Sequence, residues 1–250
     1  MTTPDVPHRF ELSIEVPGTP EQVWAAIATA NGISSWMLPT TMEEREGGHL
    51  AFHMGDTDSE GTVTGWDPPR RLAYVEPDWA TLAGQAGAAV TPMATEFLVE
   101  AQAGGTCVVR VVSSAFGTGA DWENEFWASM AEGWLPAFDF LRLYLEHFPG
   151  QTVTTLTADA ALDRPQHEVL AAMVSDLGSR GVTSELVQRN DLMATYRLTA
   201  PVPGFLTLIA ADNDGATSAV VQGHLFSPDA AGYVEREQKA WQAWLEGLEA

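Results

Sequence analysis

The first forty residues carry the pattern that most constrains the fold, a strand followed by a tight turn and two short helices. His8–Val16 alternates apolar and polar side chains, which predicts a half-buried strand. Pro17-Gly18 forms a turn, and Thr19 is a suitable N-cap for the helix that follows. Pro20 fits its first turn, where no N–H is needed. A second short helix is expected to run into Trp36.

Residues 41 to 116 are predicted to form a run of strands joined by turns. Glu46-Gly47-Gly48, Asp67-Pro68-Pro69 and Gly104-Gly105 supply these turns. The Gly- and Ala-rich segment Asp78–Pro92 is expected to form a long loop or lid. The expected strands are Thr41–Arg45, Gly48–Met54, Gly61–Trp66, Arg71–Val75, Met93–Ala101 and Thr106–Phe116.

A long helix is predicted from Asp121 to Phe148, with Asp121 or Thr118 as its N-cap. Its apolar stripe is broad and rich in aromatic residues, wider than one sheet face requires. Phe148-Pro149-Gly150 ends the helix and divides the chain into domains 1–149 and 150–250. One side of the helix carries Trp127, Met130, Trp134, Leu141 and Leu145.

The second domain is a smaller α+β domain with a similar element order: a strand, a helix, four strands and a terminal helix. This order indicates a degenerate repeat of the first domain that has lost two strands. A generic α+β extension packed on the first domain would show the same pattern. The expected elements are Val153–Ala158, Pro165–Leu177, Thr183–Arg189, Ala194–Leu198, Phe205–Ala211, Ser218–Phe226 and Pro228–Leu248.

Three blocks in the first domain resemble a known family. The opening at Pro17–Met37 resembles that of the START-like or Bet v 1-like helix-grip proteins, the SRPBCC superfamily. Gly61–Glu76 is similar to a strand–turn–strand of its subfamily named after activators of the heat-shock-protein-90 ATPase, with a Gly-x-Val strand and an acidic-Pro-Pro turn. Asp121–Phe148 resembles that family's long C-terminal helix. Over residues 1–148 the resemblance implies an α+β helix-grip fold, a curved antiparallel sheet wrapped around the helix.

The charge balance narrows the range of partners. The chain has 34 acidic and 12 basic residues, a formal net charge of -22 at pH 7. A surface of this sign repels nucleic acids and anionic lipids, so neither is an expected partner. The sequence contains no apolar run long enough for membrane insertion, and its N-terminus does not resemble a secretory signal. With a single cysteine and little lysine, it is interpreted as an acidic bacterial protein of the cytoplasm.

Motifs of the common catalytic classes are absent from the sequence, including a Walker loop, a strand-linked Gly-x-Gly-x-x-Gly and a Gly-x-Ser-x-Gly elbow. His49 and His53 are four residues apart on a predicted strand, a spacing of about 13 Å that does not suit a shared metal. Cys107 lies in an apolar strand and is expected to be a buried small hydrophobe. No catalytic residue, metal or other cofactor is therefore predicted.

Aromatic side chains give the main functional indication, because they lie on the elements that surround the cavity of a helix-grip fold. Their functional interpretation is a site for a hydrophobic or aromatic molecule between sheet and helix. Each ring taken singly is also the usual content of a protein core. The predicted ligand-binding residues are Trp36, Phe52, Met54, Tyr74, Phe97, Phe116, Trp127, Met130 and Trp134.

Polar residues on the same elements could act inside such a cavity. Glu76 is in phase with Leu72 and Tyr74, and a carboxylate on an apolar strand face would have a raised pKa. The end of a strand is usually solvated, so the simpler interpretation of Glu76 is a carboxylate at the rim. His53 alternates away from Phe52 and is expected to face solvent. The full set is His53, Glu76, Glu96, Asp121, Glu123 and Glu125.

Three functional hypotheses follow from these features. The leading one is a non-enzymatic binder of a hydrophobic or aromatic small molecule. The second is an enzyme of the polyketide cyclase/aromatase type, in which the cavity shapes a reactive chain and carboxylates or His53 move protons. The third is a co-chaperone-like protein-interaction module, an expectation from the resemblance alone. The superfamily contains all three kinds of protein, and assembly as a homodimer is left open.

Overall fold

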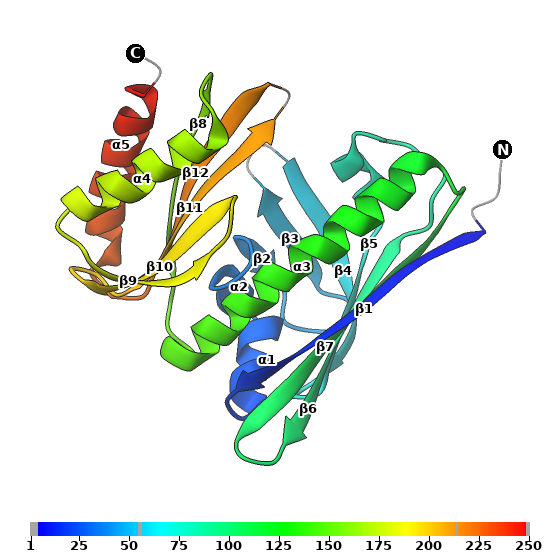
Figure 1. Ribbon diagram of the computed structural model, residues 1–250. Helices are drawn as coiled ribbons and strands as arrows, with labels where there is room; N and C mark the ends of the chain where they lie inside the picture. The colour runs from blue at the N-terminus through cyan, green and yellow to red at the C-terminus, as the bar shows by residue number, and fades with distance from the viewer. Residues whose placement is uncertain (1–4, 55–56, 214, 249–250) are drawn as a thin grey trace. The chain divides into compact units, whose positions relative to one another are not determined.

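The computed structural model describes residues 5–54, 57–213 and 215–248 (Figure 1). The chain folds as two compact units, Met1–Gly150 and Gln151–Ala250, called unit 1 and unit 2 below. Each unit contains one antiparallel sheet with helices packed on it. The fold class is therefore α+β with two units, as the sequence predicts.

In the seven-stranded sheet of unit 1, the first strand of the chain pairs with the last. β1 (Val6–Pro17) pairs with β7 (Thr106–Gly117), and the order then returns through the chain as β6, β5, β4, β3 and β2. All neighbouring strands are antiparallel, so the sheet is the wrapped sheet of a helix-grip fold. The other strands are β2 (Thr40–Met42), β3 (His49–Met54), β4 (Thr57–Asp67), β5 (Arg71–Glu76) and β6 (Met93–Gln102).

The two short helices after β1 form as predicted. α1 (Pro20–Ala28) begins with a capping box, in which the Thr19 hydroxyl accepts a hydrogen bond from the Gln22 amide and the Gln22 side chain accepts one from the Thr19 amide. α2 (Ala30–Ser34) follows at once. The Trp36 indole N–H then donates to a carbonyl of α1 at 2.9 Å, which ties the end of the opening to its first helix.

The long helix α3 (Asp121–His147) crosses one face of the sheet of unit 1 (Figure 1). The predicted cap was wrong: the N-cap residue is Ala120, and neither Asp121 nor Thr118 caps the helix with its side chain. Glu123 instead binds the segment before the helix: its carboxylate accepts hydrogen bonds from the amide and the hydroxyl of Thr118, each at 2.9 Å. A side chain of the first turn of α3, and not an N-cap side chain, therefore holds the start of the helix to the residues before it.

The five-stranded sheet of unit 2 follows the same rule of strand order. Its first strand, β8, pairs with its last, β12, and the order then returns through β11, β10 and β9. This agreement supports the interpretation of unit 2 as a shortened repeat, which stays a prediction. The elements are β8 (Thr154–Leu162), α4 (Gln166–Ser179), β9 (Thr183–Arg189), β10 (Met193–Ala200), β11 (Gly204–Asn213), β12 (Ala216–Leu225) and α5 (Ala230–Glu246).

The core of unit 2 is dominated by aliphatic side chains from the sheet, packed against α4 and α5, with Trp241 as its largest member. The guanidinium carbon of Arg180 lies 3.6 Å from the ring centroid of Trp241. Arg180 also forms an ion pair with Asp176 at 2.5 Å, so the cation over the ring has a counter-charge.

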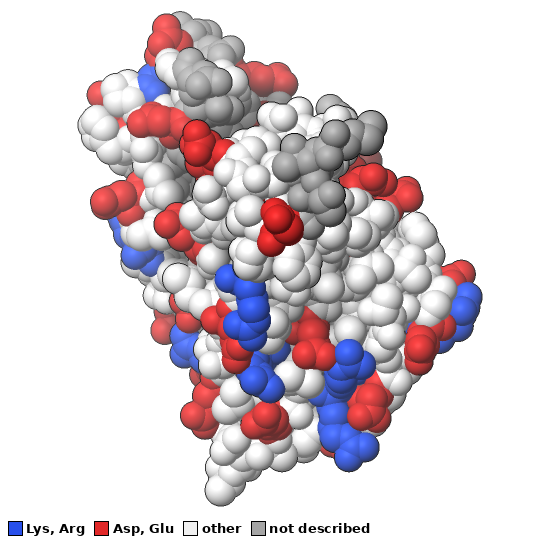
Figure 2. Space-filling view, turned by 90° about the vertical axis from the view of Figure 1, so that its right-hand side faces the viewer, with Lys and Arg blue, Asp and Glu red and all other residues white. Residues whose placement is uncertain are grey.

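Charged side chains of both signs lie on the surface, and the chain as a whole has 34 acidic and 12 basic residues. Figure 2 shows Lys and Arg side chains lying beside Asp and Glu side chains on one face of the molecule. Arg110, for example, forms an ion pair with Glu11 at 3.2 Å, and Lys239 forms one with Glu235 at 2.9 Å. Pairing of this kind leaves the surplus carboxylates to set the surface potential. No helix in the described part of the chain is both long and apolar enough to cross a membrane.

Candidate ligand-binding site

Unit 1 contains a cavity of about 360 Å³ between its sheet and α3. Residues of β3 to β7 form the floor, and α3 forms one wall. Met37 and Leu38, in the segment after α2, close a second side, and Leu82 of the 3-10 helix η1 (Trp79–Ala83) closes a third. All of these elements belong to unit 1, so the site can be described within that unit alone.

The helical wall combines large and small side chains on one face of α3. The residues that line it recur at intervals of three and four, the spacing of one helix face. Ser129 and Gly133 are exposed as well as cavity-lining, so the cavity opens to the surface beside the middle of the helix. A Cβ added at Gly133 would meet no atom within 4 Å. The residues of α3 that line the cavity are Phe126, Ser129, Met130, Gly133, Trp134 and Ala137.

The floor carries a row of polar side chains that extends across β4, β5, β6 and β7. The Ser59 hydroxyl donates to Glu76 Oε1 at 2.5 Å, and the Thr95 and Ser113 hydroxyl oxygens lie 2.9 Å apart. Thr95 also hydrogen-bonds the Tyr74 hydroxyl and is its partner in the β5–β6 register. Buried hydroxyls that bond one another satisfy their hydrogen-bonding needs without water. We call Ser59, Tyr74, Glu76, Thr95 and Ser113 the polar row.

Glu76 is buried in the floor and not solvated at the rim, so the simpler interpretation of this residue was wrong. Only 5% of its surface is exposed. Burial raises the pKa of its carboxyl, the Ser59 hydrogen bond partly offsets this, and the result is about 7. Gly61 on β4 makes room for it, since a Cβ there would lie 3.4 Å from Glu76 Cγ and 2.7 Å from the Val75 carbonyl oxygen. This close approach accounts for the glycine of the Gly-x-Val strand.

The structure brings together five of the nine predicted ligand-binding residues at the cavity surface: Phe52, Met54, Tyr74, Met130 and Trp134. Trp36 and Phe97 are buried behind this surface, with ring centroids 6.4 and 5.5 Å from that of Trp134. They support the wall without lining it. Trp127 does not line the cavity; it lies in a cluster with Trp79 that packs against the lining residues Met93, Phe126 and Met130.

Phe116 lies outside the cavity, against the expectation from its aromatic character. It is 50% exposed, because β7 alternates strictly and Ala115 is the neighbour that points inward. The same alternation could have placed Phe116 on the outer face from the sequence. The alternation on β7 also puts Ser113 in phase with the buried Val111, and that on β6 puts Thr95 in phase with Phe97. The inward direction of both residues could therefore have been predicted from the sequence, although polar residues are not usually expected to face a core.

The other lining residues missed from the sequence are Met37, Leu38, Ser59, Leu82, Met93, Phe126, Ser129, Gly133 and Ala137. Those on α3 could have been found, because they share the helix face of Met130 and Trp134. Those in loops had no periodicity to indicate their direction.

The remaining polar candidates do not reach the cavity. His53 faces outward and pairs with Asp58 at 3.0 Å, as expected of a solvent-facing residue. Glu96 forms an ion pair with Arg71 on the outer face of the sheet, and Asp121 and Glu125 are exposed on α3. Among the described residues, no group of three or more His, Cys, Asp or Glu side chains is placed to hold a metal ion. Burial, and secondarily Glu21, raises the pKa of the Cys107 thiol, which does not favour a nucleophile.

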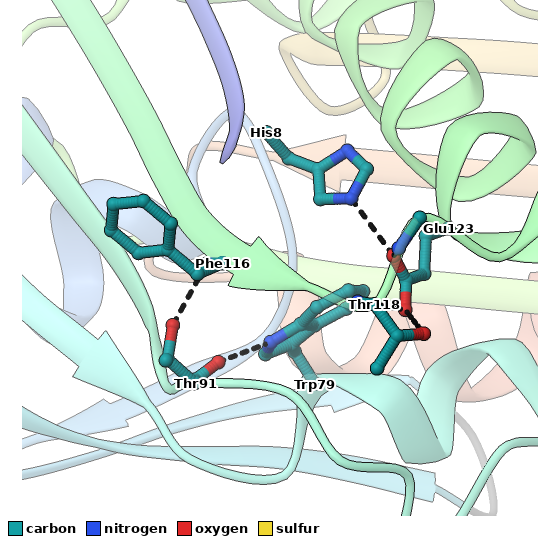
Figure 3. A network of polar contacts seen from close by, with 7 residues as sticks. His8, Trp79, Thr91, Phe116, Thr118 and Glu123 are labelled. Atoms are coloured by element: carbon teal, nitrogen blue, oxygen red, sulfur yellow. Dashed lines mark hydrogen bonds and ion pairs between the residues drawn. The ribbon is translucent and has the colours of Figure 1, made fainter. Parts of the chain in front are cut away.

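Glu123 is buried in a separate network that fixes the end of the sheet to the start of α3 (Figure 3). Its Oε2 lies 3.0 Å from His8 Nε2 and accepts from the Gly119 amide at 2.8 Å. Burial raises the pKa of this carboxyl, but the hydrogen bonds from Thr118, His8 and Gly119 outweigh burial and lower the pKa to about 2. Glu123 is therefore a structural anion and does not line the cavity.

The predicted lid is anchored by a fully buried tryptophan. The Trp79 indole N–H donates to the Thr91 carbonyl at 2.9 Å, and the Thr91 hydroxyl accepts from the Phe116 amide at 2.8 Å (Figure 3). The Trp79 ring lies 5.0 Å from that of Phe126 and 5.8 Å from that of Trp127. These contacts tie both ends of the segment to β7 and α3, while Leu82 reaches the cavity.

A sheet wrapped around a long helix, with a cavity between them, defines the Bet v 1-like class of helix-grip folds. Residues 17–146 match the family model described as activator of Hsp90 ATPase homolog 1-like protein. This match covers 130 of the 250 residues, so the chain belongs to that family, a subfamily of the SRPBCC superfamily. A search of curated proteins finds no match.

Solved structures resemble the chain at low identity. Protein MLL2253 from Mesorhizobium loti is 19% identical over 56% of this chain and 98% of its own, with a TM-score of 0.48. DynU16, from the dynemicin biosynthetic locus, is 14% identical over 98% of both chains, with a TM-score of 0.44. The di-domain ARO/CYC BexL of the BE-7585A biosynthetic pathway is 15% identical over 89% of this chain and 86% of its own, with a TM-score of 0.45.

Proposed function

We propose that unit 1 binds a hydrophobic or aromatic small molecule in the cavity between its sheet and α3. The observation that carries the proposal is the cavity itself, about 360 Å³ with apolar walls and a single polar row. Small-molecule sites typically have roughly 300–1,000 Å³, a mainly apolar lining and a few placed polar groups. Membership of a superfamily with a ligand-binding fold supports the same function.

The apolar walls are suited to flat or flexible apolar ligands. Trp134 presents an indole that is itself braced by Phe97 and Phe138, each with its ring centroid 5.5 Å away. Four methionines also line the site: Met37, Met54, Met93 and Met130. Because methionine has three rotatable bonds and a polarizable sulfur, such walls adjust to ligands of different shape. We therefore expect the site to bind a class of similar compounds and not one compound alone.

An enzyme of the polyketide cyclase/aromatase type is the second candidate, and Glu76 is the observation that favours it. A carboxyl whose pKa is about 7 can donate or accept a proton near neutral pH. Tyr74 and Ser59 hydroxyls flank it in the polar row. Turnover that Glu76→Gln abolishes while ligand binding persists would favour this candidate over a carrier.

An interaction module would be favoured by a contiguous exposed apolar patch. In the described part of the chain, the large apolar side chains that are exposed lie on β3, β7, α3, β9 and the turn after β9: Met54, Phe116, Leu135, Leu186 and Leu192. The co-chaperone hypothesis therefore has no specific observation in its support. Assembly as a homodimer also stays a prediction.

Native mass spectrometry of freshly purified protein, compared with the same sample denatured, tests the proposal directly. A reproducible excess mass in the native spectrum would reveal a retained small molecule, whose identity would distinguish a carrier from a cyclase. A titration with the neutral fluorophore N-phenyl-1-naphthylamine covers the case of a ligand lost during purification.

A cavity-filling variant tests whether the fluorophore binds in the cavity of unit 1. Gly133→Leu puts a side chain into open space at the cavity, and it should weaken binding of the fluorophore by about tenfold or more. Gly232→Leu is the matched control, because Gly232 lies in α5 with no atom within 4 Å of an added Cβ. Equal affinities of the two variants would contradict the proposed site.

A further inference from the structure

Among the residues that the structure describes, Glu76 is the one carboxyl that lines the cavity, and only one of its two oxygens has a partner there. Among the described residues Ser59 is its hydrogen-bond donor, and the Ser59 hydroxyl occupies Oε1. The other hydroxyls of the polar row bond one another, Thr95 with Ser113 at 2.9 Å and with Tyr74. Oε2 is therefore the carboxyl oxygen of Glu76 that remains available to a ligand.

Within residues 5–54, 57–213 and 215–248, no cation lines the cavity around Glu76. The elements that enclose the cavity contribute apolar, hydroxyl or glycine positions, and no Lys, Arg or His is among the lining residues. In the described part of the chain, Tyr74 is the only other titratable group that lines the cavity. Burial, followed by the charge of Glu76, raises its pKa well above the ordinary value. A carboxylate at this place would be buried without a counter-ion, which disfavours the charged form.

We propose that the cavity selects a neutral ligand with a carbonyl group, whose oxygen accepts a hydrogen bond from the protonated carboxyl of Glu76. A ligand that carries a carboxylate is disfavoured, because it would place a second acidic group beside Glu76 with no cation to balance it. This inference rests on the proposed function, since it specifies the ligand class of the same site. It adds a polar contact that the apolar walls alone do not provide.

The geometry assigns a separate role to each oxygen of the carboxyl. Ser59 donates to Oε1 and so fixes the rotation of the group, while the acidic proton resides on Oε2 and points to the ligand. A carboxyl proton is a donor, whereas a carboxylate has acceptor capacity only. Deprotonation therefore removes the bond to a carbonyl oxygen and leaves two acceptors facing each other. Binding of a carbonyl compound should accordingly decrease as the pH rises through about 7.

Three naphthalenes of similar shape test this preference on the full-length protein. 2-Acetylnaphthalene carries a ketone, 2-ethylnaphthalene lacks a polar group, and 2-naphthoate carries a carboxylate. Their affinities can be measured by displacement of N-phenyl-1-naphthylamine at pH 6 and pH 8.5. At pH 6 we expect the ketone to bind about fivefold more tightly than the hydrocarbon, the ratio that one net hydrogen bond supplies. The carboxylate should bind more weakly than both.

Two substitutions of Glu76 separate its hydrogen bond from its charge. Glu76→Gln keeps a donor in place without a titrating group, so the ketone preference should persist and become equal at both pH values. Glu76→Leu removes the donor, so the ketone and the hydrocarbon should bind equally. Glu96→Gln is the control, because Glu96 is paired with Arg71 outside the cavity and should leave the wild-type pH dependence unchanged.

The outcomes distinguish this inference from the proposed function. If the fluorophore binds and Gly133→Leu blocks it, but wild type shows no preference for the ketone or no loss of that preference at pH 8.5, the inference is overturned and the proposed function stands. If neither the fluorophore nor any naphthalene binds to the folded wild-type protein, both are overturned.

Discussion

Units 1 and 2 follow one rule of strand order but differ in the side chains between sheet and helices. In unit 2 the buried core residues of β8, β11 and β12 are Leu, Val and Ala, apart from Thr217 near the start of β12. In unit 1 the corresponding interval includes Ser59, Glu76, Thr95 and Ser113, all buried. The comparison teaches that strand order does not create a cavity. In unit 1 the polar groups that face the cavity bond one another, so they are satisfied without filling the space beside α3.

The helices of the two units also differ in the size of the side chains that they contribute to the space beside the sheet. α5 inserts Trp241 and Leu245 into the core of unit 2, and both are almost fully buried. α3 lines the cavity with the small residues Ser129, Gly133 and Ala137. Small side chains on the helix and polar side chains on the sheet thus leave space in unit 1, whereas large apolar side chains fill unit 2.

The largest effect that would test this comparison is expected at the two tryptophans. Trp241→Ala should destabilise the protein by about 4 kcal/mol, because it removes a fully buried ring and leaves Arg180 without its aromatic contact. Trp134→Ala should cost about half as much, because Trp134 is partly exposed at the cavity. Fluorophore binding should show the reverse order, with the greater loss in Trp134→Ala. Urea unfolding and fluorophore titration of both variants measure the two effects. Equal losses of binding would place the ligand elsewhere than unit 1.

The next effect concerns Glu76 and pH. Its pKa is about 7 in the folded protein, against the ordinary value of 4.5 for a glutamate carboxyl, so the folded state holds an extra proton between these values. The free energy of unfolding should therefore fall by about 3 kcal/mol as the pH rises from about 4.5 to about 7. Glu76→Gln removes this dependence and should be more stable than wild type at pH 8, with no such gain at pH 4.5. Urea unfolding at both pH values measures it.

Glu96→Gln serves as the control for this prediction, since Glu96 lies outside the cavity. Its stability difference from wild type should not change in the same way between pH 4.5 and pH 8. A Glu76→Gln protein that is destabilised equally at both pH values would show that the carboxyl is not buried as the structure has it. Glu123 has the opposite sign, because its pKa of about 2 makes its contribution disappear as the pH falls from 4.5 toward 2.

The smallest effect is expected at Phe116, the predicted ligand-binding residue that lies outside the cavity. Phe116→Ser should change the free energy of unfolding by no more than about 0.5 kcal/mol, because the ring is half exposed. The fluorophore should bind as tightly as to wild type. Thermal unfolding and the same titration check both statements. A clear loss of affinity would show that the ligand extends over the outer face of β7.

Periodicity was a reliable guide wherever a residue belongs to a regular element. The predicted strand Thr183–Arg189 coincides with β9, and Asp121 is the first residue of α3. The predictions were wrong where contacts between elements far apart in the sequence decide whether a side chain is buried or lines the cavity. Glu76 looks like a rim residue because it is the last of its strand, but the cavity walls cover it. Trp127 and Phe97 have the face and chemistry of lining residues, yet they pack against other rings and do not line the space.

The sequence by itself determined the element order, the inward face of each strand and the family, since these depend on period, turn residues and local motifs. Only the tertiary structure decided which inward side chains border an open space and which fill the core. That distinction depends on the distance between α3 and the sheet, which many contacts far apart in the sequence fix together. The raised pKa of Glu76 has the same origin, because desolvation of a carboxyl depends on what covers it and not on its neighbours in the chain.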